Sequence, residues 1–105
     1  MRKISLESSK ALLDRRPMQK DNTKVVVEGS DCYLYLHDNL IASFEEDGLY
    51  IRNAGWFSKT TKERLNALPG ISIVQKKGVW YLNGQKWDGG RTNVVSNVIV
   101  STLNQ

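Results

Sequence analysis

The chain has 105 residues, of which 40% are hydrophobic and 25% are charged, with a single cysteine and a formal net charge of +4. This length accommodates one domain with one core, since a domain of about this size buries roughly two-thirds of the surface of its unfolded chain, and the balanced composition excludes disorder throughout. No apolar run approaches the roughly 20 residues that span a bilayer, charges interrupt the N-terminus before a secretory signal forms, and the lone Cys32 excludes an internal disulfide, so we expect a cytoplasmic protein without membrane contact.

The N-terminal region predicts a helix over residues 5–15. Ser5 is a candidate N-cap, and the residues behind it repeat at helical spacing from Ile4. Pro17 disfavours helical backbone at the residue before it, and so ends the helix. The helix is half apolar and half basic, which is typical of a helix that packs on a domain with its charges in solvent.

Four runs rich in Val, Tyr, Leu and Ile follow, separated by short groups of turn residues. They cover residues 24–28, 32–37, 40–45 and 49–53. Alternation between such turns predicts a meander of antiparallel strands.

The turns set the predicted pairing of these strands. Two-residue turns at the Asp-Asn and Asp-Gly pairs would place Tyr35 opposite Ala42 and Phe44 opposite Ile51. The side chains predicted to share the core face are Tyr33, Tyr35, Ala42, Phe44, Leu49 and Ile51. The opposite face is also partly apolar, so we expect a helix on one side and a partner, the C-terminal tail or a second copy of the chain on the other.

A second, short helix is predicted to start at Thr60, which with Glu63 fits a capping box. Leu65 and Leu68 supply its apolar side, and the Pro-Gly pair behind them ends it. A helix this short is stable only when it is packed. The aromatic pair at residues 56–57 is expected to anchor it.

The next segment predicts two hairpins. Its strongest signal is the Asn-Gly pair at residues 83–84, because a type I′ turn needs positive φ at both central positions. The pairing places Leu82 opposite Ile73 and returns Trp87 beside Trp80. The predicted inward side chains are Ile71, Ile73, Trp80, Leu82 and Trp87, and the outward ones are Val74, Lys76, Tyr81 and Lys86.

These elements predict an α+β fold. Residues 1–90 are expected to form a single domain, an antiparallel sheet of meanders and hairpins with an N-terminal helix and one short capped helix inserted between strands. Residues 91–105 form an apolar tail that fits either a strand or a helix. The tail is expected to pack on the sheet or on a partner chain, and a homodimer through the sheet or the tail is open.

The chain carries no catalytic constellation. His37, its only histidine, lies beside Asp38 at a predicted turn, and such a neighbour pair without a positioned nucleophile is typical of a structural histidine. The acids at residues 45–47 lack the ligand spacing of a calcium loop, and no glycine-rich phosphate motif is present. We therefore expect no enzymatic activity, no catalytic residue, no metal and no cofactor.

Charge is segregated along the chain. Residues 1–24 carry a net +4, residues 25–51 carry six acids and no base, and residues 52–105 carry a net +6. The segments either attract one another in the fold or leave a surface positive enough to hold a polyanion. Basic side chains near aromatic ones form the predicted partner or nucleic-acid binding surface: Lys59, Lys62, Arg64, Lys76, Lys77 and Lys86.

Three sequence elements, AGW at residues 54–56, TTKERLNAL at 60–68 and WYLNG at 80–84, together resemble a family of small accessory proteins of tailed bacteriophages. The resemblance covers roughly residues 4–89. It transfers no activity and no catalytic residue. It implies a protein that works by binding in the cytoplasm of the infected bacterial host.

Two functions follow from this reading. In the first, which we favour, the protein binds a host protein, such as a defence component, and inhibits or redirects it. In the second, it is a small basic nucleic-acid-binding protein that uses phosphate contacts and aromatic stacking.

Overall fold

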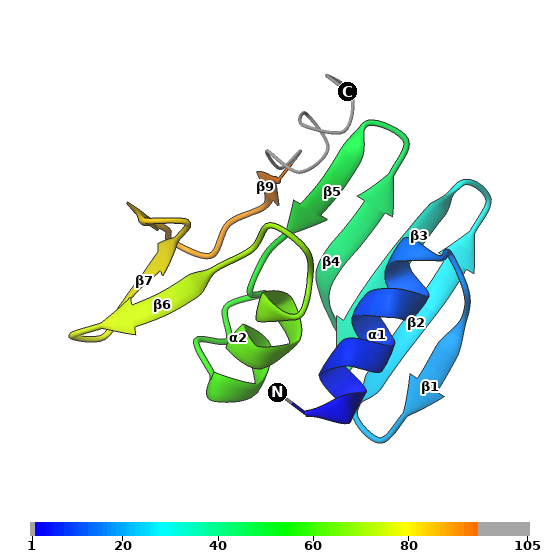
Figure 1. Ribbon diagram of the computed structural model, residues 1–105, viewed down its shortest axis with the longest axis horizontal. Helices are drawn as coiled ribbons and strands as arrows, with labels where there is room; N and C mark the ends of the chain where they lie inside the picture. The colour runs from blue at the N-terminus through cyan, green and yellow to red at the C-terminus, as the bar shows by residue number, and fades with distance from the viewer. Residues whose placement is uncertain (1, 95–105) are drawn as a thin grey trace.

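Two helices and two antiparallel sheets make up the structure, a computed structural model that describes residues 2–94 (Figure 1). The elements in chain order are α1 (Lys3–Leu13), β1 (Met18–Lys20), β2 (Thr23–Glu28), β3 (Asp31–Leu36), β4 (Asn39–Glu45), β5 (Gly48–Ile51), α2 (Lys59–Asn66), β6 (Ile73–Lys76), β7 (Val79–Leu82), β8 (Gln85–Lys86) and β9 (Thr92–Asn93). The larger sheet has the order β1-β2-β3-β4-β5-β9, and the smaller one has the order β6-β7-β8. The predicted α+β class is confirmed.

Both helices lie on the same face of the six-stranded sheet, and the three-stranded sheet projects from the far side of α2 (Figure 1). The shared core contains Ala11 and Leu12 of α1 and Leu65 of α2, together with the inward side chains of both sheets. Residues 2–94 therefore share one core, with α2 between the two sheets.

α1 begins two residues earlier than predicted. Its N-cap is Arg2, which makes no side-chain cap, whereas Ser5 lies inside the helix and is buried. The predicted Ser5 cap is wrong because the Ser5 hydroxyl is used in a tertiary contact, donating to Glu63 Oε1 of α2 over 3.0 Å.

The predicted pairing of β3 with β4 is wrong. The tight turn lies at His37 and Asp38, with φ of 51° and 64°, so Tyr35 pairs with Leu40 rather than Ala42, and the register shifts between Leu34 and Tyr35. A one-residue slip turns every side chain of a strand to the other face. The buried side chains of β3 are accordingly Cys32, Leu34 and Leu36, and the tyrosines predicted as core, Tyr33 and Tyr35, are half-buried on the outer face.

The turn between β4 and β5 is also displaced by one residue. Phe44 pairs with Leu49, and Ala42 pairs with Ile51. Leu49 and Ile51 nevertheless stay on the core side, as predicted.

The cap of α2 also differs from the prediction. Ser58 is the N-cap, and its Oγ accepts a hydrogen bond from the backbone N–H of Thr61 over 3.1 Å. The predicted capping box of Thr60 and Glu63 is therefore wrong. Leu65 and Leu68 are buried, as expected.

The three-stranded sheet agrees with the prediction. Ile73 pairs with Leu82 and Gln75 with Trp80, and the Trp87 N–H donates to the Trp80 carbonyl over 2.9 Å. All five side chains predicted to face inward are buried. The Trp80 and Trp87 ring centroids lie 6.1 Å apart, so the two indoles pack against each other on the inner side of this sheet.

The C-terminal side of the described chain returns to the six-stranded sheet (Figure 1). β9 pairs with β5, and Val94 behind it is buried and donates its N–H to the Leu49 carbonyl over 2.7 Å. The remainder of the predicted tail, residues 95–105, lies outside the described residues.

Candidate binding surfaces

The outward face of the three-stranded sheet carries lysines around an apolar centre. Cross-strand pairing of Val74 with Tyr81 and of Tyr81 with Lys86 sets these side chains in one row. Lys76 Nζ lies 6.0 Å from the Tyr81 ring centroid, and Lys77 occupies the turn between β6 and β7, with φ of 51°. We call this set, Val74, Lys76, Lys77, Tyr81 and Lys86, the lysine face.

No carboxylate among residues 2–94 forms an ion pair with the lysine face. Residues 71–87 contain no Asp or Glu, and none of its lysines belongs to an ion pair within residues 2–94. Val74 is 46% exposed although it is apolar. A surface with uncompensated charge and an exposed apolar centre is suited to a negatively charged partner.

Two further predicted lysines lie on α2. Lys59 is exposed, and Lys62 Nζ donates to Gln75 Oε1 of β6 over 2.7 Å and lies 5.8 Å from the Trp80 ring centroid. Neither forms an ion pair in the described part of the chain. Lys62 therefore joins α2 to β6 while keeping its charge.

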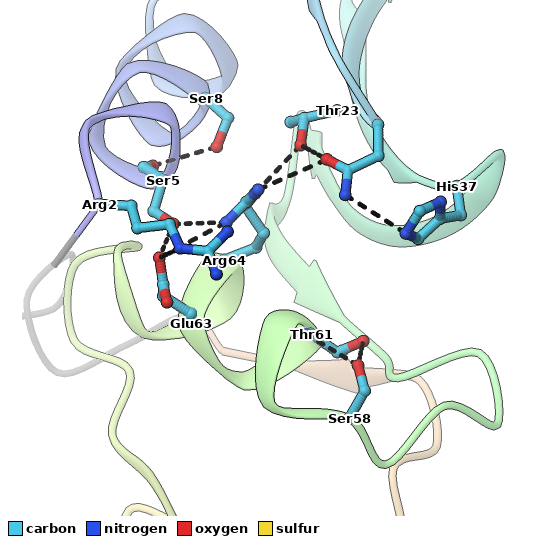
Figure 2. Close-up of polar contacts among 10 residues, drawn as sticks. Arg2, Ser5, Ser8, Thr23, His37, Ser58, Thr61, Glu63 and Arg64 are labelled. Atoms are coloured by element: carbon cyan, nitrogen blue, oxygen red, sulfur yellow. Dashed lines mark hydrogen bonds and ion pairs between the residues drawn. The ribbon is translucent and has the colours of Figure 1, made fainter.

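Arg64 is buried, so the prediction that its side chain lies on the outward basic surface is wrong. Its side chain is 1% exposed and is held between α1, α2 and the start of β2 (Figure 2). Nε donates to Thr23 Oγ1 over 3.0 Å and Nη1 to Ser5 Oγ over 2.8 Å. Glu63 supplies the negative charge, 3.6 Å from Nη1. Arg64 thus stabilises the packing of both helices on the sheet.

Burial and the neighbouring charges shift the pKa values of Arg64 and Glu63. Burial lowers the pKa of Arg64, while the charge of Glu63 opposes that shift. For Glu63, burial alone would raise the pKa, but the hydrogen bond from Ser5 and the charges of Arg2 and Arg64 outweigh it and hold the pKa below its ordinary value. The cluster is therefore an internal ion pair with hydroxyl partners.

A sequence signal for the burial of Arg64 was present. The buried positions of α2 and the residue after its C-cap are Thr61, Arg64, Leu65 and Leu68, which is the i, i+3, i+4, i+7 spacing of an inward helix face. Arg64 lies within that stripe, whereas Lys59 and Lys62 lie outside it.

A groove that the sequence did not indicate lies between the β3–β4 turn and the start of α2. Its volume is about 280 Å³. Trp56, expected to anchor α2, is instead 58% exposed and forms part of the groove wall. Phe57 is also 52% exposed, although its ring contacts Trp80 edge-on, with the ring centroids 5.1 Å apart. We call this groove, lined by Leu36, His37, Asn39, Ile41, Trp56, Ser58, Thr60 and Thr61, the Trp56 groove.

Side chains with catalytic potential are dispersed. His37 Nε2 lies 3.3 Å from the Asn22 side-chain amide and is exposed. Cys32 is buried, and burial raises the pKa of its thiol, against a smaller opposing effect of the Arg15 charge. Among residues 2–94 no three His, Cys, Asp or Glu side chains are close enough to hold a metal ion.

The outer edge of the six-stranded sheet carries a compensated basic group. Arg91 Nη1 and Nη2 donate to the two Glu45 carboxylate oxygens over 3.1 and 3.3 Å, and the guanidinium lies 3.8 Å from the Tyr50 ring centroid. These hydrogen bonds, with another from Ser43, hold the pKa of Glu45 below its ordinary value despite partial burial. The Arg91 charge is therefore paired with Glu45 within the protein.

Comparison with known proteins gives one match. The sequence model of a family described as Kyanoviridae Gp96 protein matches residues 1–99, which confirms and extends the resemblance carried by the AGW, TTKERLNAL and WYLNG elements. No curated protein and no solved structure matches the chain. Neither helix of the described residues has the length and apolarity needed to cross a membrane.

Proposed function

The chain belongs to the Kyanoviridae Gp96 family of phage proteins, and from this premise we propose that it is a non-enzymatic accessory protein that binds a host protein. The target, such as a component of host defence, would be inhibited or redirected in the cytoplasm of the infected cell. The observation that carries the proposal is the lysine face, whose charges have no carboxylate partner in the described chain.

The composition of the lysine face supports a protein partner. Val74 and Tyr81 form an apolar centre, and Lys76 and Lys86 flank it. Protein interfaces combine a desolvated apolar centre, in which tyrosine is enriched, with a polar rim. Lysines at such a rim accelerate association with an acidic surface and disfavour basic partners.

Nucleic acid is the second candidate, favoured by one specific feature. Lys76 lies within cation–π distance of Tyr81, and Lys86 is its cross-strand neighbour. Phosphate contacts beside an aromatic ring on which a base can stack are the usual means of binding single strands. Such binding would weaken steeply with salt, because engaging about four phosphates gives log K a slope of about −3 to −4 against log salt.

The test is capture of partners by the tagged protein from phage-infected host cells, with and without nuclease. The proposal predicts a host protein that survives nuclease, is retained by the K3E/K10E variant and is lost with K76E/K86E. Lys3 and Lys10 are exposed residues of α1, so the two double variants change the charge equally at different places. A nuclease-sensitive set of partners lost with K76E/K86E would establish the second candidate, and equal capture by both variants would overturn the lysine face as the site.

A further inference from the structure

We propose that the Trp56 groove is a second docking site, which takes a bulky apolar side chain from an acidic segment of the same host protein. This inference rests on the proposed function and adds to it the chemistry of the partner.

The floor of the groove is apolar and fixed. Leu36 ends β3 and Ile41 lies in β4, and both side chains are almost fully buried in the core. Ile41 is the extra residue at the register shift, because Leu40 pairs with Tyr35 and Ala42 with Leu34. The shift thus places an aliphatic side chain where the regular pairing would not, and a β-bulge commonly re-aims a side chain next to a functional site.

Trp56 is displayed by a loop that is held from within the protein. The backbone N–H of Trp56 donates to the Asn53 carbonyl over 2.9 Å. The Asn53 side-chain oxygen accepts from the backbone N–H of Gly55 over 2.8 Å. Asn53 is itself buried and donates its N–H to the Gly89 carbonyl over 2.9 Å. Any side chain at position 89 would collide with Asn53, and the backbone φ of +87° at Gly89 also favours glycine.

This anchoring gives the exposed indole a role. Because hydrogen bonds hold the backbone of this loop, less backbone entropy is lost when a partner covers Trp56. Tryptophan is also among the residues most enriched at the energetic centres of protein interfaces. The opposite rim is equally ordered, since the Ser58 and Thr61 hydroxyls are 2.9 Å apart.

The size of the groove indicates one side chain as its occupant. Its volume of about 280 Å³ is just below the range of about 300–1,000 Å³ typical of pockets for drug-sized ligands. A Leu, Met, Phe or Trp side chain fits such a space. The aliphatic floor and the indole of Trp56 favour an apolar side chain as the part of the partner that enters the groove.

The charges around the groove indicate an acidic segment. Lys59 lies between the lining residues Ser58 and Thr60, is exposed, and has no ion pair in the described chain. No carboxylate lines the groove. Asp38, beside the lining residues His37 and Asn39, does not line the groove; its side chain is 94% exposed, and its carboxylate lies 3.8 Å from the Lys24 ammonium. An Asp or Glu next to the apolar anchor would therefore meet a complementary charge.

A random-peptide display library, selected on the full chain and counter-selected on W56A, tests the chemistry of the occupant. We expect enriched peptides to carry a bulky apolar residue next to Asp or Glu. In a titration of labelled peptide, W56A should weaken binding by about tenfold or more, and L6A should leave it unchanged. Leu6, 54% exposed on α1, is the matched control for loss of an exposed apolar side chain.

The fluorescence of the wild-type protein supplies an independent readout. Because Trp80 and Trp87 are buried, a blue shift on adding the peptide reports Trp56 entering an apolar contact. Selected peptides without acidic residues, equal affinity for W56A, or no peptide selected while single-stranded oligothymidylate binds in a Trp56-dependent way, would each overturn the inference.

Failure of the groove and failure of the lysine face give different results with the captured host protein. If K76E/K86E loses the protein and W56A retains it at full affinity, the proposed function stands and the groove inference is overturned. If both variants retain it at full affinity, the lysine face is overturned as well. Equal urea midpoints for W56A and the wild type exclude unfolding as the cause of any loss.

Discussion

The two sheets of this protein use their basic side chains differently. In the six-stranded sheet they have carboxylate partners: Lys20 pairs with Glu7 and Lys24 with Asp38, and Arg91 pairs with Glu45. The three-stranded sheet contains Lys76, Lys77 and Lys86 and no acid. These basic side chains of the first region are thus paired with carboxylates within the fold, whereas those of the second have no carboxylate partner among residues 2–94.

This difference separates stability from binding. α2 lies between the two regions and shows both kinds of side chain, with Arg64 buried among hydrogen-bond partners and Lys59 exposed. A basic side chain with buried partners contributes to folding, whereas an exposed and unpaired one is available to another molecule. The predictions below test that separation.

The largest effect is expected in the aromatic core of the three-stranded sheet. Trp80→Ala should lower the free energy of unfolding by about 3–5 kcal/mol, because it leaves a large cavity between Phe57 and Trp87. Urea denaturation measures this. Trp80→Phe should cost much less, since Trp80 Nε1 is buried without a hydrogen-bond partner and its removal leaves no polar group unsatisfied. Equal losses in the two variants would contradict the account.

Arg64→Ala should be the next largest, at about 3 kcal/mol, because it leaves the Ser5 and Thr23 hydroxyls without the donor that Arg64 supplies and removes the charge that faces Glu63. Lys62→Ala on the same helix should change stability by less than about 0.5 kcal/mol. Urea midpoints of both variants check this. Similar midpoints would mean that burial does not distinguish the two cations.

The cap of α2 predicts a smaller effect. Ser58→Ala should destabilise the protein by about 1 kcal/mol, because the Thr61 N–H loses its acceptor. Thr60→Ala, at the position that the sequence suggested as the cap, should have a much smaller effect. The reverse order in thermal denaturation would restore the Thr60 capping box.

Acid should act on the six-stranded sheet through Glu45. Its pKa is lower in the folded state than in the unfolded chain, because Arg91 and Ser43 donate to it. Its contribution is present above the ordinary glutamate pKa of about 4.3 and is lost as pH falls through the lower folded value. Wild type should therefore lose slightly more stability than E45Q between pH 7 and pH 3, as measured by urea midpoints. Equal losses would show that the ion pair contributes nothing.

The sequence predicted one sheet better than the other for a physical reason. The three-stranded sheet is organised by two turns, Lys77 with Gly78 and Asn83 with Gly84, whose positive φ values fix the register. In the larger sheet the β3–β4 turn uses two non-glycine residues and is followed by a register shift. Residue preferences alone place such a turn one residue out, and they do not reveal the register shift that exchanges the two faces of β3 relative to β4.

The candidate sites show the same limit. The sequence correctly indicates that the lysines of the lysine face are exposed. The prediction places Arg64 on the surface and Trp56 in the packing of α2, and the structure shows the reverse for both residues. Arg64 is buried by hydrogen-bond partners from α1 and β2 that are distant in sequence. Trp56 lies in a loop that is held by the backbone hydrogen bonds of Asn53, one to Trp56 and one to Gly89. The helical spacing of the buried side chains of α2 already indicates that Arg64 faces inward, whereas the exposure of Trp56 depends on tertiary contacts that composition and periodicity do not contain.

The most direct test of the central claim is the equilibrium affinity of the purified, nuclease-resistant host partner for three forms of the protein: wild type, K76E/K86E and K3E/K10E. We predict that K76E/K86E weakens binding by about tenfold or more, while K3E/K10E, with the same change in net charge, weakens it by less than about twofold. Equal weakening in the two variants would show that only net charge matters. Unchanged affinity in K76E/K86E would contradict the lysine face as the binding surface.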